Sequence, residues 1–305
     1  MLKIEHLTKV FGKGTINEMT ALNDVSFHGN AGDFITIIGS NGAGKSTLMN
    51  CIAGVFPAET GKITLDGIDI TKMPEHKRAK YIGRVFQDPM KGTAFDMTIE
   101  ENLSIAYNKI RKRGLQAGIS KADRELFQEK LSLLGMGLEN RMKEKVRLLS
   151  GGQRQALTLF MAVIAKPKLL LLDEHTAALD PSAARKVLEQ TDYFAKDEKM
   201  CTMMITHNMK AALEHGNRTI LMQGGQIKMD ISGKERDEMT VENSSKNSRS
   251  TMTECCCNCE ETTSGQAGSK GFLFCPFFFC FFMTFSSDRH GNMVYSYDSM
   301  RIDTK

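Results

Sequence analysis

A glycine-rich segment followed by lysine and serine is the clearest chemical feature of this 305-residue chain. It reads Gly39-Ser-Asn-Gly-Ala-Gly-Lys-Ser46, which has the spacing G-x-x-x-x-G-K-[ST]. Glycines let the backbone reach positive φ, so that several N–H groups can turn toward one anion. Lys45 would then meet the β- and γ-phosphates, and the Ser46 hydroxyl would meet Mg²⁺. The segment therefore predicts a binding site for a nucleotide triphosphate.

The residues on either side of this segment supply the context that a phosphate loop requires. Residues 34–38 form a short apolar run typical of a buried strand, and the residues after the loop predict a helix. A helix that begins at the loop adds the positive end of its dipole to the anion site. We expect the phosphates of ATP to be held by Gly39, Ser40, Asn41, Gly42, Ala43, Gly44, Lys45, Ser46 and Thr47.

Four further polar segments follow in order along the chain. Gln87 comes first, at the end of a predicted strand, and Leu-Ser-Gly-Gly-Gln at 149–153 opens a predicted helix. Asp173 and Glu174 then end a run of four leucines, and His207 ends the last apolar strand. Taken singly, each residue has an ordinary structural explanation. The ordered set indicates one shared site, because independent accidents would have to fall in sequence along one chain.

At these spacings residues 1–240 resemble the ATPase subunits of ABC transporters. The resemblance implies that Asp173 holds the Mg²⁺ shell, since a hard cation prefers carboxylate oxygen. It implies that Glu174 polarises the attacking water as the general base. Gln87 would sense Mg²⁺ and this water, and would move with the transport partner. His207 would hold the γ-phosphate and organise the base.

The same resemblance implies a head-to-tail homodimer. The family fold places the serine-glycine segment of one subunit against the nucleotide of the other, and a helix N-terminus with a serine hydroxyl forms a suitable anion site. The chain thus carries two half-sites for one γ-phosphate, which only a pair of subunits can close. Asp180 would lie at the dimer seam, and Phe11 would form the aromatic platform under adenine. The serine-glycine segment consists of Ser150, Gly151, Gly152 and Gln153.

One residue departs from the common family pattern. His175 stands where many ABC ATPases carry proline. This variant, together with the run at 74–89, resembles a bacterial importer subgroup whose members are described as ATP-binding components of tryptophan/tyrosine or related amino-acid uptake systems. The resemblance implies a separate integral-membrane permease, a solute-binding protein outside the membrane, and a place on the cytoplasmic face of the cell membrane. We expect residues 88–97 to form part of the permease dock.

Two other functions remain open from the sequence. An ABC exporter has the same kind of ATPase cassette. A soluble ABC ATPase without a permease is a more distant alternative, because such proteins usually carry two cassettes or a long coiled coil, and this chain has one cassette and no heptad run.

Composition bounds these alternatives. The chain is 41% hydrophobic and 25% charged, which is typical of a soluble globular protein. Its net charge of +4 is too small to indicate a nucleic-acid partner. The N-terminus has no signal-peptide pattern, and no apolar run reaches the roughly 18 residues that span a bilayer as a helix. Cys51 and Cys201 are the only cysteines before residue 241, which fits a reducing cytosol.

The order of apolar periods predicts an α/β fold over residues 1–240. We expect a P-loop NTPase core with a mostly parallel sheet, an antiparallel β layer, and a helical subdomain inserted at about 90–160. The predicted strands lie at about 2–11, 21–28, 34–38, 62–66, 82–86, 169–172, 201–206, 218–222 and 226–230. The predicted helices lie at about 45–53, 75–79, 98–107, 121–134, 151–165, 182–196 and 208–215.

The composition changes near the C-terminus. Residues 243–270 are rich in small polar residues, which predicts disorder, and residues 271–285 hold eight phenylalanines without a helix or strand period. A membrane tail anchor is one interpretation, but the run is short and contains proline. The cysteines at 255–259 lack the paired spacing of a zinc site. We favour a disordered tail over 241–305 that is translated out of frame, because T-rich DNA encodes phenylalanine runs.

Overall fold

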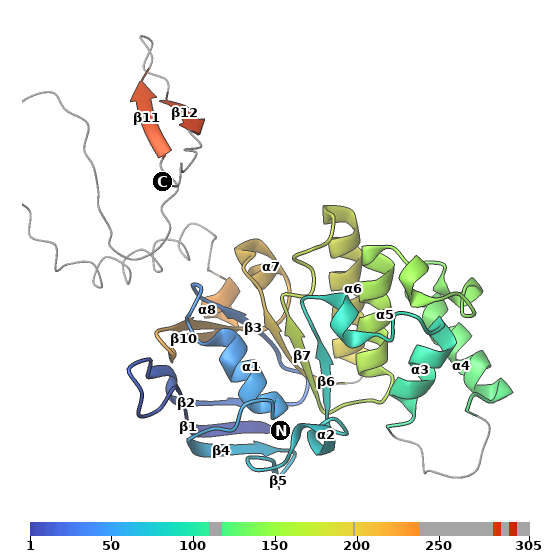
Figure 1. Ribbon diagram of the computed structural model, residues 1–305, viewed down its shortest axis with the longest axis horizontal. Helices are drawn as coiled ribbons and strands as arrows, with labels where there is room; N and C mark the ends of the chain where they lie inside the picture. Colours follow the sequence, from blue (N-terminus) through green and yellow to red (C-terminus); the bar gives the residue numbers. More distant parts are fainter. Residues whose placement is uncertain (110–117, 198, 238–282, 288–292, 298–305) are drawn as a thin grey trace, which may run out of the picture. The chain divides into compact units, whose positions relative to one another are not determined.

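The short apolar runs of the sequence form a six-stranded sheet at the centre of the fold (Figure 1). The computed structural model describes residues 1–109, 118–197, 199–237, 283–287 and 293–297. Five neighbouring strands run parallel, and β10 pairs antiparallel with β9 at one edge. In spatial order the strands are β10 (Gln226–Ser232), β9 (Arg218–Gln223), β3 (Phe34–Ile38), β8 (Cys201–Ile205), β7 (Leu169–Asp173) and β6 (Ile82–Val85).

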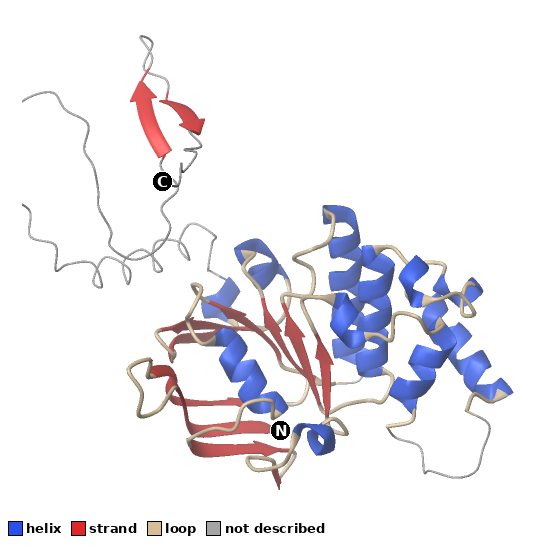
Figure 2. Cartoon of the chain, viewed as in Figure 1, coloured by secondary structure: helices blue, strands red, loops and turns tan. Residues whose placement is uncertain are grey.

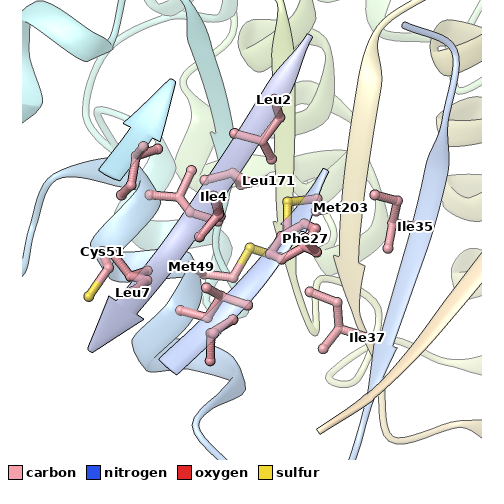
Figure 3. Close-up of a cluster of buried hydrophobic side chains, with 14 of the residues drawn as sticks. Leu2, Ile4, Leu7, Phe27, Ile35, Ile37, Met49, Cys51, Leu171 and Met203 are labelled. Atoms are coloured by element: carbon pink, nitrogen blue, oxygen red, sulfur yellow. The ribbon is translucent and has the colours of Figure 1, made fainter. Parts of the chain in front are cut away.

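A second, antiparallel sheet packs near one face of the central sheet, with α1 (Lys45–Ala53) as part of the same core. Its strands are β2 (Met19–Gly29), β1 (Leu2–Phe11), β4 (Thr60–Leu65) and β5 (Ile68–Asp69). Figure 3 shows Ile4 of β1, Met49 of α1 and Met203 of β8 in this core. Burial of these large side chains fixes the helix that follows the phosphate loop against the sheet.

Helices cover the other face of the central sheet. Along β7, Leu169 and Leu171 join the core with α1, whereas Leu170 and Leu172 join a second core with α5 (Gly151–Val163) and α6 (Pro181–Asp197). Successive side chains of a strand point to opposite faces, so a run of four leucines suits a strand that is buried on both sides. The predicted mostly parallel α/β core with an antiparallel layer is confirmed.

Between β6 and α5, the described residues of the stretch predicted as a helical insertion contain two α-helices and three 3₁₀ turns. Its α-helices are α3 (Ile99–Tyr107) and α4 (Lys121–Ser132), and its 3₁₀ turns are η1 (Pro89–Gly92), η2 (Leu138–Asn140) and η3 (Val146–Leu148). Both α-helices begin with a capping box, Thr98 with Glu101 and Ser120 with Asp123. Each box satisfies two backbone N–H groups of the first turn, which explains why the helices begin there.

Three short helices complete the first unit: α2 (Glu75–Arg78), α7 (Met209–Glu214) and α8 (Lys234–Asp237). The sequence did not predict α8 or β5. The sequence did contain a signal for β5, because Asp66-Gly67 is a typical two-residue hairpin turn. Both residues have positive φ in the structure, and β5 pairs with β4 across them. No helix in the described ranges is both long and apolar enough to cross a membrane.

A hairpin lies in the second compact unit of the chain, which spans Cys256–Lys305. Its strands β11 (Met283–Ser287) and β12 (Met293–Tyr297) pair antiparallel, in a stretch where the sequence predicted disorder (Figure 2). The valine and tyrosines of β12 have high β-propensity, which was overlooked. The cysteine cluster and most of the phenylalanine run lie outside the described residues.

Candidate nucleotide-binding and hydrolysis site

The order of the parallel strands brings four of the predicted segments to one edge of the sheet. β3, β8, β7 and β6 are consecutive neighbours, and the carboxyl ends of parallel strands share one edge. The phosphate loop follows β3, His207 follows β8, Glu174 follows β7, and Gln87 follows β6. Residues far apart in the sequence therefore converge where ligands bind in open α/β sheets.

The phosphate loop needs glycine at particular positions. Gly39, Gly42 and Gly44 have φ of 150°, 79° and 96°, which other residues rarely adopt. A Cβ on Gly39 would lie 2.2 Å from the carbonyl oxygen of Met222, and one on Gly44 would lie 2.6 Å from that of Ala21. The loop thus turns tightly against the neighbouring strands, with its backbone free of side chains, as a cradle for phosphate requires.

Lys45 lies inside this loop and is only 5% exposed. Its Nζ donates hydrogen bonds to the carbonyl oxygens of Gly39, at 2.6 Å, and Ser40, at 2.9 Å. Burial lowers the pKa of the ammonium, while the carboxylates of Glu174 and Asp173 act in the opposite direction. A cation at the centre of a glycine loop fits the charge and the size of nucleotide phosphates.

A buried arginine that the sequence did not single out holds the other end of α1. The Arg78 guanidinium is 3% exposed and donates to the carbonyl oxygens of Cys51 and Ile52, both at 2.8 Å. It also donates to the carbonyl oxygens of Met73 and Thr71. A cation at a helix C-terminus satisfies carbonyls that have no partner in the helix and complements its dipole. Arg78 thereby fixes the helix whose first turn bears Lys45.

Asp173 is the residue predicted to hold Mg²⁺ through a hard oxygen ligand. It is half-buried at the end of β7, and burial raises the pKa of its carboxyl, as does the charge of Glu174. Arg84 and Lys45 act in the opposite direction. Within the described part of the chain no three acidic, histidine or cysteine side chains form a metal cluster. This donor set fits Mg²⁺, which is usually held by one or two carboxylates together with substrate phosphates.

Glu174 and His207 form a close polar contact at the same sheet edge. Glu174 Oε1 lies 2.6 Å from His207 Nε2, and the glutamate side chain is 16% exposed against 47% for the histidine. The backbone of Glu174 has φ of 44°, an unusual conformation for a residue with a side chain, and its N–H donates to Ile205 in β8. Backbone strain of this kind is concentrated at functional sites.

Gln87 and Phe11 lie at the ends of two strands, β6 and β1. Gln87 is exposed beyond the end of β6. Phe11 ends β1 and is half-buried, with the Phe56 ring 5.3 Å away edge-to-face and the Lys9 ammonium 5.2 Å from its ring centroid. These contacts fix the ring orientation of Phe11, and its role under adenine remains a prediction.

The serine-glycine segment begins α5, as the sequence predicted. Ser150 and Gln153 form a capping box, and Gln153 also bonds to Met136 and Arg141 within the helical subdomain. A Cβ on Gly152 would lie 2.8 Å from the Cβ of Ala183, so glycine permits close packing of α5 on α6. Ser150 and Gly151 are exposed, so the Ser150 hydroxyl and the Gly151 N–H at the start of the helix can meet a ligand outside the subunit.

Asp180 makes a local cap at the start of α6. Its Oδ1 accepts hydrogen bonds from the backbone N–H groups of Ser182, at 3.1 Å, and Ala183, at 3.0 Å. The Ser182 hydroxyl also donates to it at 2.7 Å, and these bonds lower the pKa of the Asp180 carboxyl. Asp180 is exposed, and its carboxylate has a structural task within the subunit as the cap of α6. Its place at a dimer seam remains a prediction.

His175 proves to be a core residue. It is 2% exposed, and its Nε2 lies 3.3 Å from the Thr191 hydroxyl of α6. Burial lowers the pKa of the imidazole to about 4, with a further contribution from the charge of His215. The imidazole is therefore neutral near neutral pH, and it anchors the turn after Glu174 to α6.

Comparison with known proteins agrees with this geometry. The family model described as ABC transporter matches residues 22–177. The chain is 43% identical to a tyrosine transport ATP-binding protein of Clostridioides difficile, over 79% of this chain and 96% of that protein. It is 31% identical to an energy-coupling factor transporter ATP-binding protein, EcfA2, of Clostridium tetani, over 75% of this chain and 78% of that protein.

Solved structures show the same fold. A nucleotide-free ATP-binding cassette from an ABC transporter superposes with a TM-score of 0.65 at 28% identity, over 78% of this chain and 93% of that one. A dimeric ATP-binding cassette in a post-hydrolysis state, bound to ADP and Pi, superposes with a TM-score of 0.64 at 26% identity, over 76% of this chain and 98% of that one. This chain belongs to the ABC transporter family, as an ATP-hydrolysing, ATP-binding subunit.

Proposed function

We propose that the protein hydrolyses MgATP to drive uptake of tyrosine or a related amino acid through a separate permease. The observation that carries the proposal is the convergence of the phosphate loop, the Glu174–His207 pair and Gln87 at one sheet edge. The solute class rests on the 43% identity to a tyrosine transport ATP-binding protein. Mg²⁺ would be held by Asp173 and Ser46, together with the nucleotide phosphates.

The residues of the site divide the hydrolytic task. Bound MgATP supplies the phosphate that is transferred to water. Lys45 and the loop amides bind and orient its phosphates, and Glu174 accepts a proton from the attacking water. His207 holds the carboxylate of Glu174 in place through the 2.6 Å contact, and it would also contact the γ-phosphate. Gln87, which follows β6 at the same sheet edge, would report the state of the site to the permease.

The site is completed by a second copy of the chain. Ser150 and Gly151 are exposed at the N-terminus of α5, where the Ser150 hydroxyl and the Gly151 N–H can meet an anion. In a head-to-tail homodimer they would face the γ-phosphate bound by the phosphate loop of the partner. ATP binding would then close the dimer, and hydrolysis would open it. The dimeric solved cassette supports this arrangement.

A cavity beside Gln87 is the best candidate for the permease dock. It has a volume of about 280 Å³ and lies between β6, η1, α3 and α5. The guanidinium of Arg84 lies 4.6 Å from the ring centroid of Phe86, and both side chains line the cavity. A permease helix seated here would touch the residue that directly precedes Gln87. Met90, which is 52% exposed, extends the apolar surface at η1.

Reconstitution tests the proposed function. The chain and its permease are placed in proteoliposomes with ATP on the side that carries the chain, and labelled tyrosine with a solute-binding protein is added on the other side. Tyrosine should move toward the ATP side, and the Glu174→Gln variant should abolish this movement. Movement away from the ATP side would identify an exporter, and ATP hydrolysis that no membrane partner affects would indicate a soluble ATPase.

A further inference from the structure

A second buried arginine, Arg236 of α8, holds the C-terminal end of α7. Its guanidinium is 7% exposed. One terminal nitrogen donates to the carbonyl oxygens of Ala212, at 2.9 Å, Leu213, at 3.0 Å, and His215, at 2.7 Å. These are carbonyls of the last turn of α7 and of the residue after it, so the arginine acts as a cationic C-cap from a separate segment of the chain.

The other end of α7 is tied to His207. Asn208 directly follows this histidine and caps the helix, because its Oδ1 accepts from the backbone N–H of Ala211 at 3.1 Å. The N–H of Ala212 donates to the Asn208 carbonyl oxygen at 2.9 Å. A helix of six residues is a short rigid element of about 9 Å. A shift of its C-terminal end is therefore passed to His207.

Arg236 also links α7 to β3, the strand that leads into the phosphate loop. Its Nε donates to the Thr219 hydroxyl at 3.0 Å, and this hydroxyl lies 2.9 Å from that of Thr36 in β3. The Thr36 hydroxyl in turn donates to the carbonyl oxygen of Ala212 at 3.1 Å. Thr36 and Thr219 are fully buried, so these hydroxyls can form a network of fixed geometry. Figure 1 shows α8 beside α7 and the central sheet.

We propose that Arg236 is a positioning residue for hydrolysis, which sets α7 and thereby aligns His207 with Glu174. The proposal rests on the proposed function, because it assigns a role within the same ATPase site. Arg236 does not touch the reacting atoms. It determines where the imidazole stands relative to the phosphate loop, and misplacement of a catalytic group by about 1 Å can lower a rate by up to 10²-fold.

Steady-state kinetics of Arg236→Gln and Arg236→Lys test the proposal. The glutamine variant should lower the kcat for ATP hydrolysis by about tenfold and leave the KM for ATP within about twofold, since the phosphate loop is intact. The lysine variant should recover part of kcat, because its ammonium can still meet carbonyls although it lacks the fork that reaches Thr219. Glu235→Gln, at an exposed position of the same helical turn, is the matched control and should match the wild type.

A second measurement separates positioning from general stability. If Arg236 acts through His207, then Arg236→Gln should change the residual rate of a His207→Ala variant by less than about twofold. An equal loss of kcat in both backgrounds, or an unchanged kcat in Arg236→Gln, would overturn the proposal. Should the glutamine variant fail to fold, the lysine variant in the same two backgrounds decides the question. A wild-type protein without ATPase activity would instead overturn the proposed function.

Discussion

Glu174 Oε1 and His207 Nε2 lie 2.6 Å apart, so the ends of β7 and β8 form one acid–imidazole pair. The pair stands at the same sheet edge as the phosphate loop, which follows β3 beside β8. The positive φ of Glu174 and its backbone bond to Ile205 orient the carboxylate before any ligand binds. Such preorganisation would let the proposed base act without rearrangement during the reaction.

Lys45→Ala should weaken ATP binding. The ammonium is buried within the loop, and a hydrogen bond to a charged group is worth about 1.5–3 kcal/mol, so affinity should fall about 10- to 100-fold. Titration calorimetry measures this loss. Lys196→Ala, which removes an exposed lysine of α6, is the control and should bind ATP as the wild type does. Equal affinity in both variants would contradict the assignment of Lys45.

Asp173→Asn should abolish Mg²⁺-dependent hydrolysis and raise the unfolding temperature of the nucleotide-free protein. The folded protein raises the pKa of this carboxyl through burial, so its ionised form destabilises the fold at neutral pH, and an amide removes that cost. Asp180→Ala should lower the unfolding temperature, because it removes the side-chain cap of α6. The hydrogen bonds of this cap lower the pKa of the Asp180 carboxyl, so its ionised form stabilises the fold at neutral pH. Thermal unfolding scans of both variants measure these changes. A lower unfolding temperature for Asp173→Asn would contradict the prediction that the buried carboxylate destabilises the fold.

His175→Gln should make stability less dependent on pH. The folded protein holds the pKa of His175 at about 4, below the 6.5 of an exposed histidine, so acidification protonates the unfolded chain first and favours unfolding. Between about pH 7 and about pH 5, protonation of His175 in the unfolded chain should lower the free energy of unfolding by about 2 kcal/mol. The glutamine variant should not show this loss. Hydrogen bonding to Asp192 raises the pKa of His215, which adds stability at acidic pH in both proteins. Urea unfolding curves with equal pH dependence would contradict the role of His175.

Sequence patterns predicted much of the fold and several of the segments that meet at the candidate site, for physical reasons that a few residues illustrate. A loop such as Gly39–Ser46 encodes its own backbone geometry, and four leucines before Asp173 report a strand buried on both faces. The predicted ABC ATPase fold and function are confirmed. The contact between Glu174 and His207 depends on strand order, which no local pattern encodes; the resemblance implied only that His207 organises the base.

The sequence missed residues whose roles arise only from packing. Nothing in the sequence shows which backbone carbonyl groups Arg78 and Arg236 contact. Each acts on the carbonyl end of a helix elsewhere in the chain, α1 for one and α7 for the other. His175 looked like a tolerated variation in a catalytic motif, yet it is a neutral core histidine. Such long-range contacts become visible only once the elements are placed.

Mixed dimers test whether two subunits build each site. Ser150→Arg should block the half-site formed by the serine-glycine segment, and Lys45→Ala should disable the phosphate loop, so each homodimer should be inactive. A mixture of the two variants should regain ATPase activity, because one of the two sites in each heterodimer then has both halves intact. Ser132→Arg, at the exposed last residue of α4, is the control substitution. A mixture that stays inactive would argue against shared sites.

Glu174→Gln tests the central claim most directly. The amide keeps the shape of the side chain but cannot take a proton, so turnover should fall by roughly 10²–10⁴-fold while ATP binding persists. The variant should therefore accumulate as a dimer with trapped ATP, measured by light scattering after gel filtration and by analysis of the bound nucleotide. Near-wild-type ATPase activity, or a variant that stays monomeric with saturating MgATP, would contradict the account.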